Sequence, residues 1–268
     1  MATAASVASR PTRTREAPPA WRGGLIGVVG LLVTWEVVGL VFFAGKNGLV
    51  PPPTRIVSHM IDDGFTFYWH NARDTLYEAF VGYLWGNVLA IGLALTFLVA
   101  PFVERPLTRL GVASYCLPIL AIAPILSVTF HGQAPNIILA ALAVFFTTLV
   151  GMLVGLRSAD QTSLDMVHAY GGGALKKVTK VRLRAALPSL FAALQIAAPA
   201  AILGAIIGDY FGAERGLGVA MVASQTALEI PRTWGLSIVA AALAGIAYGV
   251  TAYIGRLVTP WAPRATRA

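Results

Sequence analysis

The sequence carries little charge. Only 12% of its 268 residues are Asp, Glu, Lys or Arg, whereas a soluble domain has about 25%. Hydrophobic residues make up 57%, and the mean hydropathy is +0.72. This balance argues against a soluble globular protein and predicts an all-α fold that crosses a membrane several times.

Motifs of catalytic and metal sites are also missing. The one cysteine, Cys116, can form no intrachain disulfide and lies in an apolar run, where we expect a small buried hydrophobe. His59 and His70 are eleven positions apart, which fits no compact metal site. The stretch from Gly171 to Lys177 lacks both the glycine directly before the lysine and the Ser or Thr directly after it that a phosphate-binding loop needs. We therefore predict no catalytic residue, no metal site and no cofactor bound by this chain.

The positive charge is concentrated between apolar runs. A net charge of +8 and a pI near 10.0 can indicate nucleic acid binding, but Lys and Arg lie here in connectors, so we expect no nucleic acid partner. Six apolar stretches have the roughly 20 residues that cross hydrocarbon. They cover about residues 23–44, 75–100, 108–130, 135–156, 187–211 and 233–257. With the N-terminus inside, 15 of the 20 Lys and Arg fall on the inner side, which predicts that both termini are cytoplasmic.

These boundaries divide the chain into three parts. Residues 1–22 mix Arg and Pro with small residues, so we expect a disordered basic cytoplasmic tail. Residues 23–258 form the membrane domain, and residues 259–268 form a second cytoplasmic tail. The first apolar run exceeds the roughly 7–15 residues of a signal-peptide core, so we expect it to stay as the first span.

Two patterns concern packing. Pro51, Pro52 and Pro53 give a stiff extended start, and a helical rhythm of apolar residues after them predicts a short helix on the outer surface before the second span. Glycines four residues apart inside spans let helix backbones approach closely. These pairs are Gly82 and Gly86, Gly151 and Gly155, Gly204 and Gly208, and Gly245 and Gly249.

A polar, basic connector, residues 157–186, separates the fourth and fifth spans. Thr162 and Asp165 match a capping box at the start of a helix, and Gly171 supplies a left-handed residue that ends it near Tyr170. Met166, Val167 and Tyr170 then form an apolar knob. A second helix begins near Ala174 and carries a basic stripe, made by Lys177, Lys180 and Arg184.

This connector resembles the EAA loop of ABC importer permeases. The family pattern is E-A-A, three residues, Gly, nine residues, Ile, one residue, Leu-Pro. The matching positions here are Asp165-Met166-Val167, Gly171, Val181 and Leu183-Arg184. The run from Ala185 to Ser189 then resembles the ALPS segment of the nitrate/sulfonate/taurine permeases. The departures are Asp for Glu, Met and Val for the two alanines, and Arg184 for the first proline.

The resemblance implies a type I importer permease with a MetI-like fold in the bacterial inner membrane. Such a chain is not an enzyme. It works with a pair of ATPase subunits that bind ATP and Mg, a second permease copy that is expected to form a homodimer, and an extracytoplasmic solute-binding protein. The loop 162–184 would contact the ATPase through Asp165, Met166, Val167, Tyr170 and Gly171. The solute would be a small anionic or vitamin-like molecule, such as a sulfonate, nitrate, bicarbonate or a pyrimidine precursor.

Polar residues at membrane depth are candidates for the solute pathway, because such groups usually face a bundle interior. They are Glu36, Asn87, Gln195 and Asp209, together with Glu78; Glu78 and Asp209 both lie near the ends of spans, where burial of a charge costs less. Three alternatives stay open. The chain is a secondary transporter with Glu36 or Asp209 as the ion-coupling group, or a membrane scaffold without transport. Alternatively, the connector is an amphipathic basic segment that lies on anionic lipid.

Overall fold

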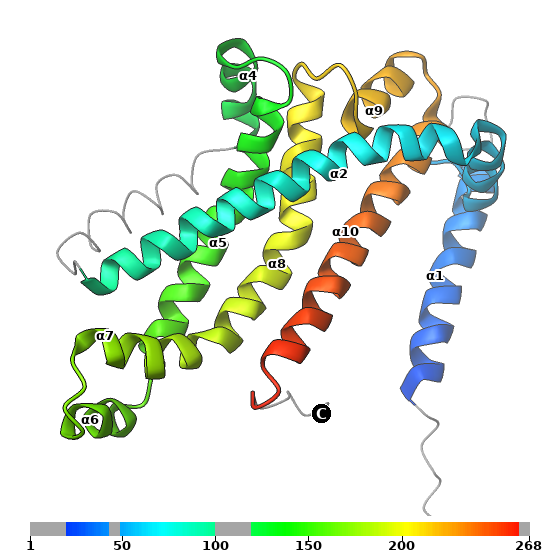
Figure 1. Ribbon diagram of the computed structural model, residues 1–268. Helices are drawn as coiled ribbons and strands as arrows, with labels where there is room; N and C mark the ends of the chain where they lie inside the picture. The colour runs from blue at the N-terminus through cyan, green and yellow to red at the C-terminus, as the bar shows by residue number, and fades with distance from the viewer. Residues whose placement is uncertain (1–19, 43–48, 100–118, 263–268) are drawn as a thin grey trace, which may run out of the picture. The chain divides into compact units, whose positions relative to one another are not determined.

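The chain is described by a computed structural model that covers residues 20–42, 49–99 and 119–262. It divides into two units, residues 1–54 and residues 55–268. Every regular element in the described ranges is a helix. The helices are α1 (Ala20–Phe42), α2 (Pro53–Val99), α4 (Ile119–Thr129), α5 (Ala134–Arg157), α6 (Gln161–Ala169), α7 (Ala174–Lys177), η1 (Val178–Arg182), α8 (Leu183–Tyr210), α9 (Leu217–Thr226) and α10 (Ile230–Val258) (Figure 1).

Five of the helices in the described ranges are long and apolar enough to cross a membrane. They run over Gly23–Val41, Pro53–Leu98, Ala134–Arg157, Ala174–Tyr210 and Ile230–Val258. The third expected span, residues 108–130, falls partly on residues 100–118, which lie outside the described residues and include Cys116. Its described part is the short apolar helix α4. The all-α membrane architecture that the composition predicts is therefore confirmed.

The second expected span begins earlier than predicted. The predicted short helix after Pro53 and the span expected from about residue 75 follow one another within α2, as two helical parts separated by the non-helical Gly64. Gly64 has a φ of 77° and a ψ of 155°, a backbone conformation that favours glycine. The structure thus has the two helical parts that the sequence predicts, one before and one after Gly64, but the second part begins about ten residues earlier than the expected boundary near residue 75.

Helix α5 lies at the centre of the second unit and approaches two neighbours closely. A Cβ atom on Gly86 of α2 would lie 2.5 Å from the carbonyl oxygen of Ala141, and one on Gly204 of α8 would lie 2.8 Å from that of Leu139. Gly155 of α5 is similarly close to the backbone of α8. Three of the four glycine pairs therefore make the predicted helix contacts, because the missing side chains let the backbones meet.

The fourth glycine pair does not pack in this way. Within the described residues, nothing lies within 4 Å of a Cβ atom built on Gly245 or Gly249 of α10. Helix α10 instead contacts α8 and α9 through other residues. Leu236 of α10 is fully buried in a cluster with Leu217 of α9 and Ile202 of α8. This cluster joins the three C-terminal helices into one core.

Candidate functional site

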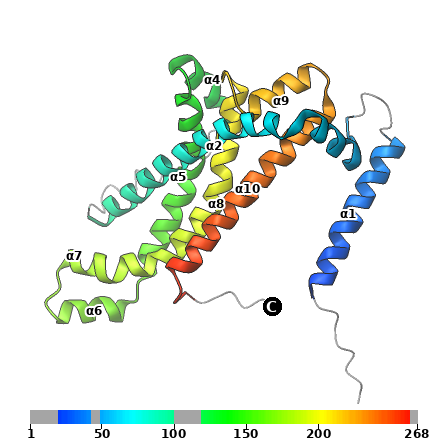
Figure 2. The same cartoon turned by 45° about the vertical axis from the view of Figure 1, so that its right-hand side comes forward.

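A helical hairpin projects from the ends of α5 and α8. Helix α6 follows α5 after three residues, and a turn at residues 170–173 leads into α7. Figure 2 shows α6 and α7 side by side. Helix α7 continues without a loop through η1 into α8, so that Ala174–Tyr210 forms one helical run of 37 residues. The predicted connector is therefore an ordered hairpin with two direct attachments to the membrane helices.

The N-terminus of α6 is capped differently from the prediction. Asp160, not Thr162, is the N-cap residue, and its Oδ2 accepts a hydrogen bond of 3.0 Å from the backbone N–H of Ser163. Asp165 does not reach back to the N-terminus, because its Oδ1 accepts a bond of 3.1 Å from Nε2 of Gln161. Asp160 thus forms a side-chain N-cap two residues before the predicted position, Thr162. The predicted capping box is thus wrong, although the helix itself forms.

The turn at the tip of the hairpin is closed by backbone hydrogen bonds. Gly171 has a φ of 73°, the left-handed conformation expected from the sequence. The N–H of Gly172 donates to the carbonyl oxygen of Val167 over 2.8 Å, and the N–H of Tyr170 donates to that of Met166 over 3.1 Å. These bonds satisfy carbonyls at the end of α6 that would otherwise lack partners. The tip is therefore held in one conformation.

The tip exposes large apolar side chains. Tyr170 is 87% exposed, Met166 is 59% exposed, and Leu175 at the start of α7 is 76% exposed. Val167 is only half-buried and turns toward Gly172, while Leu164 is the buried residue of α6. Leu175 was not part of the predicted knob, although its position directly after the glycine turn was a usable signal. The hairpin thus presents Met166, Tyr170 and Leu175 to its surroundings, and we call these three side chains the apolar tip.

The helix after the tip changes its hydrogen-bond register. Residues Val178–Arg182 form a π-helical turn, in which the N–H of Leu183 donates to the carbonyl oxygen of Val178. Lys176, Lys180 and Arg184 are exposed along this stretch, whereas Lys177 is half-buried. Residues four apart are neighbours on a helix surface. The exposed basic stripe therefore begins with Lys176 and not with the predicted Lys177.

A network of polar side chains is buried at the end of the helices opposite the hairpin. Nδ2 of Asn136 in α5 donates to Oε2 of Glu78 and to Oδ1 of Asp209, both over 2.9 Å. Oδ2 of Asp209 accepts from Oγ1 of Thr75 over 2.8 Å and from the N–H of Gly218 over 3.1 Å. Each of the three polar side chains, Glu78, Asn136 and Asp209, is 2% exposed. One amide therefore joins carboxylates from α2 and α8.

A cavity of about 590 Å³ lies beside this network. Glu78 and Asn136 reach its wall together with Asp74, and the loops around His131 and Arg215 form the rest of the lining. Asp209 does not line the cavity and contacts it through its hydrogen bonds. Of these two carboxylates, Glu78 thus lies closer to an open space than Asp209 does.

The remaining pathway candidates are dispersed over the fold. Asn87 is 6% exposed and accepts a bond of 2.5 Å from Oγ1 of Thr148, which joins α2 to α5. Gln195 is half-buried on α8 and faces Gly255 of α10. In the first unit, Glu36 accepts bonds from Thr54 through its backbone N–H, over 3.1 Å, and its Oγ1, over 2.6 Å. Glu36 therefore caps the N-terminus of α2.

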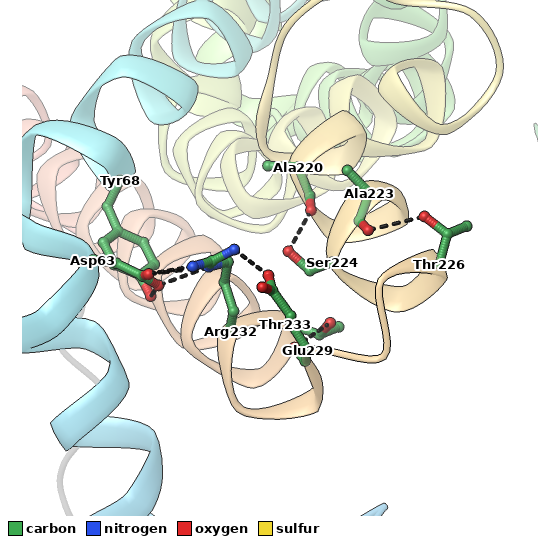
Figure 3. A network of polar contacts seen from close by, with 9 residues as sticks. All are labelled: Asp63, Tyr68, Ala220, Ala223, Ser224, Thr226, Glu229, Arg232 and Thr233. Carbon is green, nitrogen blue, oxygen red and sulfur yellow. Dashed lines mark hydrogen bonds and ion pairs between the residues drawn. The ribbon is translucent and has the colours of Figure 1, made fainter. Parts of the chain in front are cut away.

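A third polar site joins the first part of α2 to the start of α10. Nη2 of Arg232 lies 2.6 Å from Oδ1 of Asp63, and its Nε donates to both oxygens of the same carboxylate. Arg232 also pairs with Glu229, and Oη of Tyr68 donates to Asp63 (Figure 3). The guanidinium lies 5.4 Å from the ring centroid of Phe67. This cluster fixes α2 next to its break at Gly64.

Metal ligands do not gather in the part of the chain that the structure describes. No group of three or more His, Cys, Asp or Glu there has an arrangement that could hold a metal ion. The polar clusters are built instead from amide, hydroxyl and guanidinium donors around one or two carboxylates.

The arrangement of apolar helices with an ordered hairpin between the fourth and fifth expected spans is matched by known proteins. Residues 86–262 match the family described as binding-protein-dependent transport system inner membrane component. The chain belongs to this family. It is therefore a permease subunit of an ABC importer and not an enzyme, and ATP hydrolysis takes place in a partner ATPase.

Two relatives illustrate the breadth of the match. The permease is 28% identical over 207 residues to the probable ABC transporter permease protein of Haemophilus influenzae, covering 77% of this chain and 83% of that protein. It is 27% identical over 232 residues to the formylaminopyrimidine transport permease protein ThiX of Halalkalibacterium halodurans, covering 86% and 92%. The similarity therefore spans more than four fifths of each relative.

The fold has a counterpart among solved structures. A chain of the MetNI methionine ABC transporter in an inward-facing conformation superimposes with a TM-score of 0.59 at 18% identity, covering 73% of this permease and 99% of that chain. The predicted MetI-like fold is thus confirmed, and the match concerns the fold alone.

Proposed function

We propose that the hairpin of α6 and α7 couples this permease to its ATPase subunit through the apolar tip. The observation that carries this proposal is the exposure of Tyr170, at 87%, on a turn that Gly171 fixes. Large apolar side chains gathered on an exposed surface are typical of protein contact sites. Asp165, Met166 and Val167 precede the turn, so the predicted coupling residues occupy one end of the hairpin.

The two attachments of the hairpin support a mechanical role. Helix α6 is joined to α5 through three residues, and α7 is continuous with α8. A displacement of the tip therefore acts on both membrane helices at once. We infer that binding of ATP and Mg in the ATPase pair moves the tip, and that the resulting shift of α5 and α8 alternates the access of the pathway between the two sides of the membrane.

The solute pathway is proposed to pass near the cavity beside Glu78 and Asn136. Asp209 is the strongest of the sequence-based candidates, because it is hydrogen-bonded to a residue of the cavity wall. Asn87, Gln195 and Glu36 stay predictions as pathway residues. The presence of a carboxylate at Glu36 also has a structural explanation, because Glu36 caps the N-terminus of α2.

We propose a homodimer of this permease with two ATPase subunits and an extracytoplasmic binding protein. Both termini are proposed to face the cytoplasm, where the basic hairpin also lies. A reporter fused at Arg264 should be active only as a cytoplasmic reporter. A periplasmic signal from this fusion would overturn the topology and the coupling proposal together.

The solute is proposed to be a small polar molecule of the sulfonate, nitrate, bicarbonate or pyrimidine-precursor type. The name of the formylaminopyrimidine permease, similar over 86% of this chain, favours the last of these. Purification of the tagged permease in mild detergent should bring down a P-loop ATPase in equal amount. The solute can then be sought by screening the accompanying binding protein for thermal stabilisation by each of these compounds.

Substitution of the tip tests the coupling. Tyr170→Asp should leave assembly of the membrane domain intact and abolish stimulation of the ATPase by the loaded binding protein. His168→Asp is a matched control, because it places the same charge on an exposed position of the same turn, two residues away from both Met166 and Tyr170. Equal stimulation in the wild type and Tyr170→Asp would refute a role for the tip.

A further inference from the structure

A second cavity lies where α8 emerges from the expected membrane region on the side of the hairpin. It measures about 580 Å³ and is lined by Arg184, Ala185, Leu187 and Trp261. Arg184 is in the first turn of α8, and Trp261 is in the turn that follows α10. The cavity thus combines one guanidinium, one indole and an aliphatic wall at a helix end.

The surroundings of this cavity are basic. Lys176, Lys180 and Arg184 are exposed and spaced by four residues, so they share one face of the helix. The sequence from Ala174 to Gly208 contains no Asp or Glu. Among the ion pairs of the described residues, none involves these three side chains. Their charge is therefore available to an anion from outside the chain.

The apolar side chains next to the cavity indicate which kind of anion fits. Leu183 and Leu257 are 37% and 64% exposed, and Trp261 is 58% exposed. Trp is enriched at membrane interfaces, where its ring lies at the level of the headgroups. Arg and Lys near helix ends extend toward the same level while their aliphatic parts stay in apolar surroundings. A ligand here meets cations and apolar groups within one small site.

We propose that the cavity between the start of α8 and Trp261 binds an anionic phospholipid of the inner leaflet. The phosphate would lie against Arg184, with Lys180 adding charge, and an acyl chain would follow Leu187. This inference uses the proposed topology, because it needs the hairpin side to face the cytoplasm. It does not depend on the coupling role of the apolar tip, which lies at the far end of α7.

Lipid retention tests the site directly. The full-length permease is reconstituted in nanodiscs of phosphatidylcholine that contain a minor fraction of phosphatidylglycerol, and the lipids kept after extraction are counted by native mass spectrometry. Phosphatidylglycerol should be enriched over its share of the bilayer. Arg184→Gln should lower this enrichment by about fivefold, the effect of one basic residue near an anionic surface. Arg184→Lys should keep most of it.

Matched variants and a second measurement distinguish binding at this cavity from lipid binding elsewhere on the permease. Arg215→Gln removes the same charge from an exposed loop at the opposite end of the helices and should leave the enrichment unchanged. Trp261→Ala should lower it, and the fraction of tryptophan fluorescence that is quenched by lipids brominated on the acyl chain should be smaller in Trp261→Phe than in the wild type, which has five other tryptophans. Equal quenching in wild type and Trp261→Phe would overturn the location of the site.

Two further outcomes would also overturn the proposal. If inorganic phosphate displaces the retained lipid as well as soluble headgroup does, the site recognises phosphate and not a phospholipid. If Arg184→Gln keeps its lipid but loses its ATPase subunit on purification, the basic stripe belongs to the protein interface. Failure of the topology reporter at Arg264 would instead remove the premise about the leaflet, so that outcome is distinguishable from loss of the lipid site.

Discussion

Nη2 of Arg232 lies 2.6 Å from Oδ1 of Asp63, a residue 169 positions earlier in the chain. This ion pair joins the first turn of α10 to α2 one residue before the break at Gly64. The side chain of Asp63 is 7% exposed and that of Arg232 is 29% exposed. The pair therefore holds the two parts of α2 at the angle that Gly64 allows.

Removal of one partner from this pair should destabilise the permease. We expect Asp63→Asn to lower the free energy of unfolding by about 2 kcal/mol, because a partly buried guanidinium loses its carboxylate. The cost is smaller than for a fully buried pair, because water still reaches part of Arg232. Glu229→Gln is the control for a more exposed pair with the same arginine. Glu229 is 42% exposed, so its pairing should contribute under about 1 kcal/mol. Thermal unfolding in detergent measures both. Equal melting temperatures for the two variants would contradict this assignment.

Close contact between α2 and α5 can be tested with two glycines of the same helix. Gly86→Ala places a Cβ atom 2.5 Å from a carbonyl oxygen of α5, whereas within the described residues nothing lies within 4 Å of a Cβ on Gly92. Gly86→Ala should force the helices apart and cost about 2 kcal/mol, as overpacking does. Gly92→Ala should be neutral or stabilise by up to about 1 kcal/mol through helix propensity. The membrane-inserted yield and melting temperature give the comparison.

The left-handed residue at the hairpin tip provides another matched pair. Gly171 has a φ of 73°, whereas Gly173 has a φ of −75°, and no described atom lies within 4 Å of a Cβ atom built on either glycine. Gly171→Ala should cost about 1–2 kcal/mol of local stability, which should reduce ATPase stimulation, while Gly173→Ala should not. Gly171→Asn should keep most of the stimulation, because Asn tolerates this conformation. A loss in Gly173→Ala as large as that in Gly171→Ala would show that glycine conformation is not the cause.

The cap that Glu36 provides separates a structural role from a pathway role. Glu36→Gln weakens the acceptor for the backbone N–H and Oγ1 of Thr54, and should cost about 1 kcal/mol of stability. Thr34→Val is the control on the same helix, because Thr34 bonds only its own helix at Gly30. If transport falls in Glu36→Gln while its melting temperature equals that of Thr34→Val, Glu36 acts in the pathway and not as a cap.

Asn136 supplies the donors that two buried carboxylates share. Asn136→Leu removes both hydrogen bonds and leaves Glu78 and Asp209 adjacent. We expect a loss of about 2 kcal/mol, since two buried carboxyl groups then lack their shared hydrogen-bond donor. Addition of Glu78→Gln in the Asn136→Leu background should recover part of this loss by placing an amide donor beside Asp209. A double variant no more stable than Asn136→Leu would show that the carboxylates do not interact through this site.

Much of the hairpin could be predicted because its signals are local. The charged connector could not lie in hydrocarbon, and Gly171 was the residue able to end α6 in a left-handed conformation. Thr162 followed by Asp165 matches a capping box and so predicts the N-cap at Thr162. Asp160 meets the same need, an oxygen acceptor for a free N–H of the first turn, through the backbone N–H of Ser163. The sequence alone could not decide between Asp160 and Thr162 as the N-cap, because the choice depends on how the chain leaves α5.

The buried network of Glu78, Asn136 and Asp209 could not be predicted from the sequence, because its members come from distant positions in the chain. Asn136 is 58 residues from Glu78 and 73 residues from Asp209, so no spacing rule joins them. A span that begins at about residue 75 would place Glu78 near its end, but the helical part after the break at Gly64 begins about ten residues earlier, and Glu78 is 2% exposed within it. Likewise, no pattern distinguished Gly245 and Gly249, which are open in the described structure, from the glycine pairs that pack.

The uninterrupted helix from Ala174 to Tyr210 has a consequence for the transmission of force. Its 37 residues correspond to a rod of about 55 Å, with the hairpin tip adjoining one end and Asp209 at the other. A torque applied at the tip reaches the hydrogen bonds of Asp209 without crossing a flexible loop. The π turn at Val178–Arg182, where the bonding register changes, and Pro188 and Pro199, which donate no backbone hydrogen bond, are the points in this rod where twist can be absorbed before it arrives. The torsional stiffness at these points would therefore set how much of a movement of the hairpin reaches the opposite end of α8.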